Sequence, residues 1–344
     1  MFNVKIVDDI NHNLIQIVDN LRPNKIVIIS SKTVIENCYS ELKQFTRLFT
    51  SRIKVFVITD TEEHKTLHTC ELLYEKLQNF GVDKNSLIIN FGGGIITDIG
   101  AFVAATFKRG IRFVNVPTTL LGMVDASIGG KCGVNHIAKN QIGLFTNPHV
   151  VLVYPTFTKT QKQEDLLSGF AEIYKLGVIL FDYDIISIMH SPNFEDYLCY
   201  LIEKAISSKL RICYKDPEDT KLRHTLNFGH TFGHAFETYL QNHNMPKPHG
   251  YCVAWGMIAE LYLRRILTHN DLKIDHIGWL KDKFGPAPCT FDINEVLSIM
   301  RYDKKNESED RIQFVIPFPN LVIENIRIDL VRQALEEFNL RNAN

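Results

Sequence analysis

The sequence predicts two domains, a Rossmann-like α/β domain followed by a mainly α-helical one. In the first half, short runs of β-branched residues alternate with helical segments, which is typical of a mainly parallel sheet covered by helices. From about Tyr154 onward the pattern changes to long helical segments. A chain of 344 residues is also long enough for two domains, each with its own core.

The elements follow from these patterns in chain order. Strands are predicted at residues 25–30, 54–59, 86–91, 112–116 and 150–154, and amphipathic segments at 67–80 and 98–108 predict helices between them. In the second half, helices are predicted at residues 163–181, 195–214, 221–241, 250–267 and 330–341. Residues 312–317 and 321–326, on either side of Pro319-Asn320, predict a hairpin.

Composition excludes several classes of protein. The formal net charge is −1 and the pI is about 6.9, so no overall positive field would hold nucleic acid or an anionic membrane. The sequence contains no apolar run near the ~20 residues that span a bilayer, and its acidic start does not resemble a signal peptide. Seven scattered cysteines without a CxxC pair predict free thiols in the cytoplasm.

One segment of the second half concentrates polar side chains at helical spacing. Arg223, Asn227, His230, His234 and Glu237 are separated by four, three, four and three residues, which would place all five on one helix face. A face of this composition predicts a functional site. By spacing alone, His230 and His234 could share a metal ion, as i,i+4 histidines on a helix do.

Two glycine-rich segments of the first half predict ligand contacts. Gly92-Gly93-Gly94 follows a predicted strand, where a backbone without side chains could approach a pyrophosphate at a helix N-terminus. The segment is neither GxGxxG nor a P-loop, and a tight turn is the alternative reading. Residues 117–140 are predicted to form a long connection without regular structure, which is usually functional.

Several ordered motifs give this chain a resemblance to a known family. They are Gly92-Gly-Gly-x-x-x-Asp98, Arg109-Gly-Ile-Arg112-Phe, Pro117-Thr-Thr-Leu, Asp125-x-Ser-x-Gly-Gly-Lys131-x-Gly-Val-Asn135, Gly169-x-Ala-Glu172-x-x-Lys175, Leu226-Asn-x-Gly-His-Thr-x-Gly-His234-Ala, His249-Gly250 and Asp303-Lys304-Lys305. Together they closely resemble the 3-dehydroquinate synthases, which are sugar-phosphate cyclases. The match runs from about Glu62 to Lys305 and so covers most of the chain.

The resemblance implies a fold and a reaction. Residues 1–153 would form an NAD-binding α/β domain and residues 154–344 a helical domain that binds metal and substrate, in a cytoplasmic homodimer. The substrate would be 3-deoxy-D-arabino-heptulosonate 7-phosphate, and the products 3-dehydroquinate and phosphate. In this family NAD oxidises the C5 hydroxyl, phosphate is eliminated, the ketone is reduced again, and the ring opens and closes by an aldol step.

The resemblance also implies roles for individual residues. Zinc, or alternatively cobalt, would be held by Glu172, His230 and His249, which makes His234 a residue that contacts substrate or handles protons. The NAD contacts would be Glu62, Lys65, Gly93, Gly94, Asp98, Thr118, Thr119, Asp125, Lys139 and Thr160. The substrate contacts would be Lys131, Lys139, Asn140, Lys175, Lys209, Arg223, Asn227, His234 and Lys304, the last preferred over Lys305, with Arg109 from the neighbouring subunit.

The chain departs from the family pattern at a few positions. Ser31 stands where an acid usually holds the adenine ribose, and a hydroxyl binds a diol less strongly than a carboxylate. The loop between Asn135 and Lys139 is one residue shorter than usual, Asp219 replaces a common Glu, and Tyr251 follows His249-Gly250 where Glu is common.

Three alternatives to a dehydroquinate synthase remain open. Glycerol dehydrogenase and the iron-dependent alcohol dehydrogenases share the glycine loop and a helical metal domain, but release reduced cofactor. Another cyclase, such as an inosose or valiolone synthase, would act on a substrate without a carboxylate, whereas Arg223 and Asn227 favour the heptulosonate. An inactive scaffold would have little reason to keep the metal ligands and charged residues together.

Overall fold

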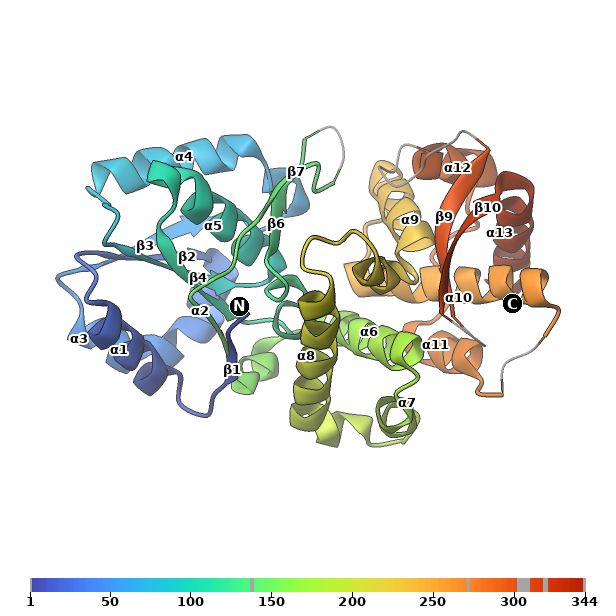
Figure 1. The fold of residues 1–344 in the computed structure, drawn as a ribbon, viewed down its shortest axis with the longest axis horizontal. Coiled ribbons are helices and arrows are strands. Elements are labelled where there is room, and N and C mark those ends of the chain that lie inside the picture. The colour runs from blue at the N-terminus through green and yellow to red at the C-terminus, as the bar shows by residue number, and fades with distance from the viewer. Residues whose placement is uncertain (1, 137–138, 271–272, 302–309, 318–320, 343–344) are drawn as a thin grey trace. The chain divides into compact units, whose positions relative to one another are not determined.

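The computed structural model describes residues 2–136, 139–270, 273–301, 310–317 and 321–342. The chain forms two compact units (Figure 1). The first consists of Met1–Leu166 together with Ile202–Tyr214, and the second of Leu167–Leu201 together with Lys215–Asn344. Among the residues that the structure describes, no helix has the length and apolar character that crossing a bilayer requires.

The first unit is built on a six-stranded sheet in which every neighbouring pair is parallel, as predicted. In spatial order its strands are β1 (Val4–Ile6), β8 (Val150–Val153), β5 (Arg112–Pro117), β4 (Leu87–Gly92), β2 (Ile26–Ser31) and β3 (Ile53–Ile58). The five predicted strands are confirmed within one residue at each end. Strand β1 was not predicted, because three residues are too short to show a pattern.

Helices cover both faces of this sheet (Figure 1). They are α1 (Ile10–Leu21), α2 (Lys32–Cys38), α3 (Lys43–Leu48), α4 (Leu67–Asn79) and α5 (Gly94–Thr106), and most of α8 (Leu198–Lys215) also belongs to the first unit. Strands β2 and β4 are buried along their whole length, as expected for central strands of a covered parallel sheet. Helix α5 begins four residues before the predicted position, so the glycine loop passes directly into it.

The segment 117–140 is more regular than the sequence predicted. It contains one π-helical turn, Gly122–Ala126, and strand β6 (Lys131–Val134), which pairs antiparallel with β7 (Ile142–Phe145). The prediction of a connection without regular structure is therefore wrong. Both elements are only four or five residues long and contain glycine, so neither produces a recognisable period.

The second unit is mainly helical, as predicted. Its helices are α6 (Gln163–Leu180, from Leu167 onward), α7 (Tyr183–Met189), α9 (His230–Asn242), α10 (His249–Thr268), α11 (His276–Phe284), α12 (Ile293–Arg301) and α13 (Ile328–Asn342). Strands β9 (Arg311–Ile316) and β10 (Val322–Arg327) pair antiparallel, so the predicted hairpin is confirmed.

The predicted helix at residues 221–241 is broken in the structure, which corrects the prediction of one continuous polar face. A short 3-10 turn, Leu222–Asn227, is followed by extended Phe228, and α9 begins at His230 after Gly229. Gly229 has a φ of +77°, and a Cβ there would lie 2.9 Å from the carbonyl oxygen of Val253. Arg223 and Asn227 therefore precede the helix that carries the histidines. The spacing could not reveal this break, because the residues on its two sides keep the helical period.

Candidate functional site

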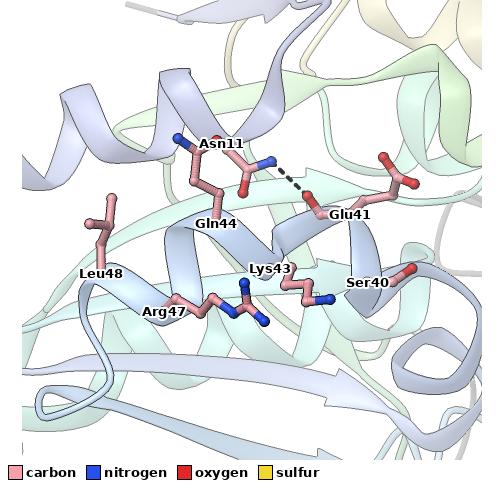
Figure 2. A pocket seen from close by; sticks show the side chains of 7 residues that line it. All are labelled: Asn11, Ser40, Glu41, Lys43, Gln44, Arg47 and Leu48. Carbon is pink, nitrogen blue, oxygen red and sulfur yellow. Dashed lines mark hydrogen bonds between the residues drawn. The ribbon is translucent and has the colours of Figure 1, made fainter.

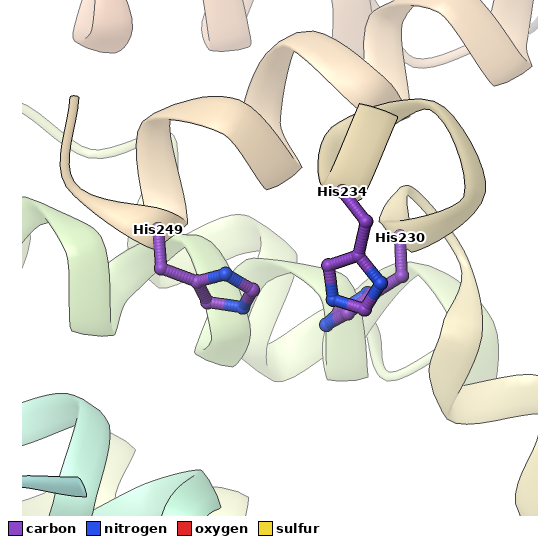
Figure 3. Close-up of side chains that lie close together, drawn as sticks. All are labelled: His230, His234 and His249. Atoms are coloured by element: carbon purple, nitrogen blue, oxygen red, sulfur yellow. The ribbon is translucent and has the colours of Figure 1, made fainter. Parts of the chain in front are cut away.

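Three histidines of the second unit gather at the start of two helices (Figure 3). His230 is the first residue of α9, His234 lies one turn later, and His249 is the first residue of α10. One ring nitrogen from each lies within 4.8 Å of the others. Glu172 of α6 faces the same point, with its Oε1 atom 3.4 Å from Nε2 of His230 and 3.9 Å from Nε2 of His249.

Two glycine contacts explain how three helices bring these side chains together. Gly250 packs so closely on α6 that a Cβ would lie 2.2 Å from the carbonyl oxygen of Ser168, and its N–H donates to the Ser168 hydroxyl at 2.8 Å. Ser168 lies one helical turn before Glu172, so this contact sets His249 beside that carboxylate. A Cβ on Gly256 of α10 would lie 2.0 Å from the Gly229 carbonyl oxygen and 2.6 Å from the Gly233 nitrogen. This close approach places the start of α9 beside α10.

The second nitrogen of two of these rings is already engaged. Nδ1 of His230 lies 3.1 Å from the carbonyl oxygen of Phe228, and Nδ1 of His249 lies 3.1 Å from Oε2 of Glu237. Such bonds orient a ring and leave Nε2 as the ligand atom, as second partners of metal-binding histidines do. Glu237, which the sequence placed on the polar face without a role, is therefore the orienting partner of His249.

The donor set fits a divalent metal ion. Glu172 is 1% exposed, and neither carboxylate oxygen has a hydrogen-bond donor among the described residues, although the group forms an ion pair with Lys175. Lys175 pairs with Oε2, whereas Oε1 faces only Nε2 of His230 and of His249, so a cation between these atoms would give the buried Oε1 a partner. Burial, and then the charge of Lys175, hold the pKa of His230 well below its ordinary value, so its ring is neutral and able to bind metal. Nitrogen and oxygen donors of this kind suit zinc and cobalt.

The structure leaves two ligand sets open. The predicted set, Glu172, His230 and His249, converges on one point. The three histidines also form a group close enough to hold an ion, as spacing alone had indicated for His230 and His234. The assignment of His234 to substrate rather than metal therefore stays a prediction.

Four of the predicted NAD residues, Gly93, Gly94, Thr118 and Thr119, meet at the carboxyl edge of the sheet, where open α/β sheets bind ligands. Gly92 ends β4, Gly93 caps α5, and the Thr118 N–H that follows β5 donates to the Gly92 carbonyl oxygen at 3.0 Å. A Cβ on Gly93 would lie 3.2 Å from a methyl carbon of Thr119, and one on Gly94 would lie 3.0 Å from the Ala126 Cβ. The loop therefore presents backbone without side chains at a helix N-terminus, which suits the binding of a pyrophosphate.

A polar network joins several of the other predicted contacts. Lys65 is 3% exposed, and its Nζ atom donates at 2.5 Å to both Oδ2 of Asp98 and Oδ1 of Asn140. Burial raises the pKa of the Asp98 carboxyl, and the Lys65 charge opposes that rise. Lys139 pairs with Glu62 at 3.3 Å. Asn135 links the two sets, because its side-chain NH2 donates to Oε2 of Glu62 at 2.9 Å and its Oδ1 accepts from the Asn140 N–H at 2.8 Å. Through it the five residues, which the sequence divided between NAD and substrate, form one connected group.

Other predicted residues have separate surroundings. Lys209 is 6% exposed and donates to Oδ1 of Asp125 at 2.5 Å. A residue predicted to contact substrate thus forms an ion pair with one predicted to contact NAD. The Thr160 hydroxyl donates to the Phe157 carbonyl oxygen at 2.8 Å. Lys131 and Arg109 are exposed. Lys304 and Lys305 lie outside the described residues.

Ser31, the residue in place of the usual acid, has a structural role. Its side chain caps α2 by accepting a hydrogen bond from the Val34 N–H at 3.4 Å, and the residue is 0% exposed. A capping hydroxyl with this burial explains why a serine suits this position in the fold.

Two hollows are lined by other residues. One, of about 490 Å³, lies against α1 and α3 and is lined by Asn11, Ser40, Glu41, Lys43, Gln44, Arg47 and Leu48 (Figure 2). The other, of about 430 Å³, is lined by residues of α10, α11, the loop before α11 and Arg341. Neither lining includes a predicted site residue.

Solved structures of other proteins share this fold. The fold is shared with 2-epi-5-epi-valiolone synthase from Streptomyces hygroscopicus, solved with NAD⁺ and Zn²⁺ bound, at 22% identity and a TM-score of 0.84 over 99% of this chain and 97% of that one. An iron-containing alcohol dehydrogenase from Thermotoga maritima has a TM-score of 0.65 at 16% identity, over 98% and 97% of the two chains.

Sequence comparison identifies the family. Residues 55–168 match the family model of the 3-dehydroquinate synthase N-terminal part, and residues 169–306 that of the C-terminal part. The chain is 35% identical to the 3-dehydroquinate synthase of Parabacteroides distasonis, over 88% of each chain. It is 36% identical to that of Pyrococcus furiosus, over 93% of this chain and 95% of the other. The chain belongs to the 3-dehydroquinate synthase family.

Proposed function

We propose that this protein converts 3-deoxy-D-arabino-heptulosonate 7-phosphate to 3-dehydroquinate and phosphate, as a carbon–oxygen lyase of the shikimate pathway. The observation that carries the proposal is the convergence of Glu172, His230 and His249 beside buried Lys175, in a chain of this family. Residues 1–153 would bind NAD, and residues 154–344 would bind the metal ion and much of the substrate.

When bound, NAD takes up and returns a hydride while a divalent ion polarises the substrate hydroxyls. Glu172, His230 and His249 would hold the ion. The substrate carries a carboxylate and a phosphate, and the chain supplies cations for both. The planar fork of Arg223 suits a bidentate grip on the carboxylate, because five N–H groups lie in one plane. Lysines would hold the phosphate as point charges, with Lys175 fixed by its ion pair with Glu172.

His234 would bind or transfer a proton on a substrate oxygen. Its ring lies 5.2 Å from that of His230 and 5.7 Å from that of His249, measured between centroids. An imidazole in this position could donate a proton to a substrate oxygen or accept one from it.

A homodimer in the cytoplasm is part of the proposal. Arg109 would act in the neighbouring subunit's site, in keeping with its exposed position at the end of the turn after α5. All seven cysteines are free, and five of them are buried, in keeping with a reducing compartment.

The experiment that tests this function follows phosphate and NADH together. The purified protein is incubated with the heptulosonate phosphate, NAD and Zn²⁺, and we expect stoichiometric phosphate release without net NADH, abolished by a chelator. Accumulation of NADH would instead indicate a dehydrogenase. If neither phosphate nor NADH is formed although NAD and metal are bound, the heptulosonate phosphate is excluded as substrate, and another sugar phosphate is the candidate.

A further inference from the structure

The turn that precedes Arg223 is organised by one carboxylate. Asp216 is 7% exposed. Its Oδ1 atom accepts hydrogen bonds from the Thr220 N–H at 3.0 Å and from the Thr220 hydroxyl at 3.2 Å. Its Oδ2 atom accepts from the Lys221 N–H at 2.7 Å and from the Arg223 N–H at 2.9 Å. Four donors from three residues thus meet on a single side chain.

Arg223 holds the other end of the same turn. Its guanidinium Nη1 donates to the carbonyl oxygen of Pro217 at 3.1 Å, and the residue is 3% exposed. The side chain at each end of the segment 216–223 therefore forms hydrogen bonds with the backbone near the other end. The N–H donors hold the pKa of Asp216 well below its usual range, so the carboxylate stays ionised.

We infer that Asp216 is a positioning residue, which fixes the backbone of Arg223 so that the guanidinium meets the carboxylate of the substrate. This inference rests on the proposed function. Without the Asp216 carboxylate, three backbone N–H groups lose their acceptor, and the turn has to rearrange to satisfy them. Because α9 begins separately after Gly229, a change in this turn leaves the metal-binding histidines in place.

The consequence is a specific kinetic signature. The carboxylate of the substrate takes no part in bond making, so loss of its partner weakens binding in the ground state and the transition state alike. In the variant Asp216→Ala we expect KM to rise about tenfold or more while kcat changes by less than about threefold. Zinc content should equal that of the wild type. Asp216→Asn keeps one acceptor oxygen, so we expect an intermediate KM, and this variant serves if the alanine variant fails to fold.

The chain offers a matched control in the first unit. Asp83 organises a similar turn, accepting from the Asn24 side chain at 2.6 Å, the Asn85 N–H at 3.0 Å and the Ser86 hydroxyl at 2.8 Å. Asp83→Asn should leave KM unchanged. A rise in KM equal to that of Asp216→Asn would show a general loss of stability and overturn the inference.

A double-mutant cycle with Arg223→Lys tests whether Asp216 acts through Arg223. If it does, the combined loss in kcat/KM will be close to the larger single loss, whereas simple addition of the two losses overturns the inference. Hydrogen exchange of the peptide 216–227 gives a readout without substrate. Faster exchange in Asp216→Asn supports the positioning role, and unchanged exchange contradicts it. If the wild type does not turn over the heptulosonate phosphate, the proposed function fails while the exchange result still stands.

Discussion

Glu172 illustrates how one residue depends on several others. Its carboxylate is buried beside Lys175 and faces Nε2 of both His230 and His249, while their Nδ1 atoms are held by Phe228 and Glu237. A ring fixed in this way presents one nitrogen to the ion and cannot turn away from it. In the proposed metal site, the orientation of two ligand rings therefore depends on Phe228 and Glu237, which are not themselves among the predicted ligands.

The roles of His249 and His234 can be separated by substitution. We expect His249→Ala to lose most of its zinc, because it removes a ligand atom whose orientation is fixed. His234→Ala should keep its zinc and lose about a hundredfold or more in kcat, as expected for a general acid–base residue. Zinc content after dialysis and steady-state rates measure the two effects. Equal loss of zinc in both variants would contradict the predicted ligand set.

At the scale of elements, the start of α9 depends on Gly229. A Cβ at this position would meet Cγ of Met257 at 2.5 Å and the Val253 carbonyl oxygen at 2.9 Å, in a backbone with φ of +77°. Gly229→Ala should therefore destabilise the protein by about 2–4 kcal/mol through strain and overpacking, and lower its zinc affinity.

Gly285 provides the control for the Gly229 substitution. It also has a positive φ, of +64°, but no atom lies within 4 Å of a Cβ built there. Its ψ of −175° places it in a region that is essentially restricted to glycine, so Gly285→Ala should cost about 1–3 kcal/mol through the backbone alone and leave zinc affinity unchanged. Urea unfolding and zinc titration measure both variants, and an equal loss of zinc affinity in the two would show that the approach of α9 to α10 contributes nothing to the site.

The packing of α6 against α11 predicts a pH dependence. The Tyr174 ring stacks on Trp279 with centroids 4.0 Å apart, and its hydroxyl lies 2.8 Å from Nδ1 of His276. Burial lowers the pKa of His276 from its ordinary 6.5 to about 4. Between pH 4 and pH 6.5, His276 is protonated in the unfolded chain but neutral in the folded protein. The contribution of His276 to the free energy of unfolding is therefore fully present above pH 6.5 and is lost as the pH drops toward 4. The loss is about 3 kcal/mol, at about 1.4 kcal/mol per pH unit.

Substitution of His276 should remove this part of the pH dependence. His276→Asn keeps a hydrogen-bonding group near the Tyr174 hydroxyl but does not titrate. From pH 7 to pH 5, the metal-free variant should lose about 2 kcal/mol less stability than the metal-free wild type, measured by urea unfolding. Identical losses would assign the pH dependence to other groups.

At the scale of the whole molecule, the proposed dimer makes a prediction about shared sites. If Arg109 acts in the partner's site, a heterodimer of Arg109→Ala and Lys175→Ala subunits has one site with both substitutions and one site with neither. Random pairing would then restore about a quarter of the wild-type activity, although each variant alone is inactive. Co-expressed subunits with different tags measure this, and the separately purified variants are the control. No recovery would place Arg109 outside the site.

The sequence predicted most of the regular structure because local patterns carry it. Five strands and the glycine loop followed from β-branched runs and the Gly92-Gly93-Gly94 signal, and the long helices from their apolar period. Elements of three to five residues, such as β1 and the turn at Gly122–Ala126, were too short to show a period. Residues 221–241 were wrongly predicted as one helix because the break at Gly229 is stabilised by α10, which is distant in sequence.

The sequence by itself determined the fold class, the family motifs and the types of residue at the candidate site. Only the tertiary structure decided how these residues meet: Glu172 beside His230 and His249, Lys65 between Asp98 and Asn140, and Asp216 across the turn that carries Arg223. The physical reason is that residue type and period are local properties of the chain. A hydrogen bond or a shared ligand joins residues that only packing brings within 3–4 Å of each other.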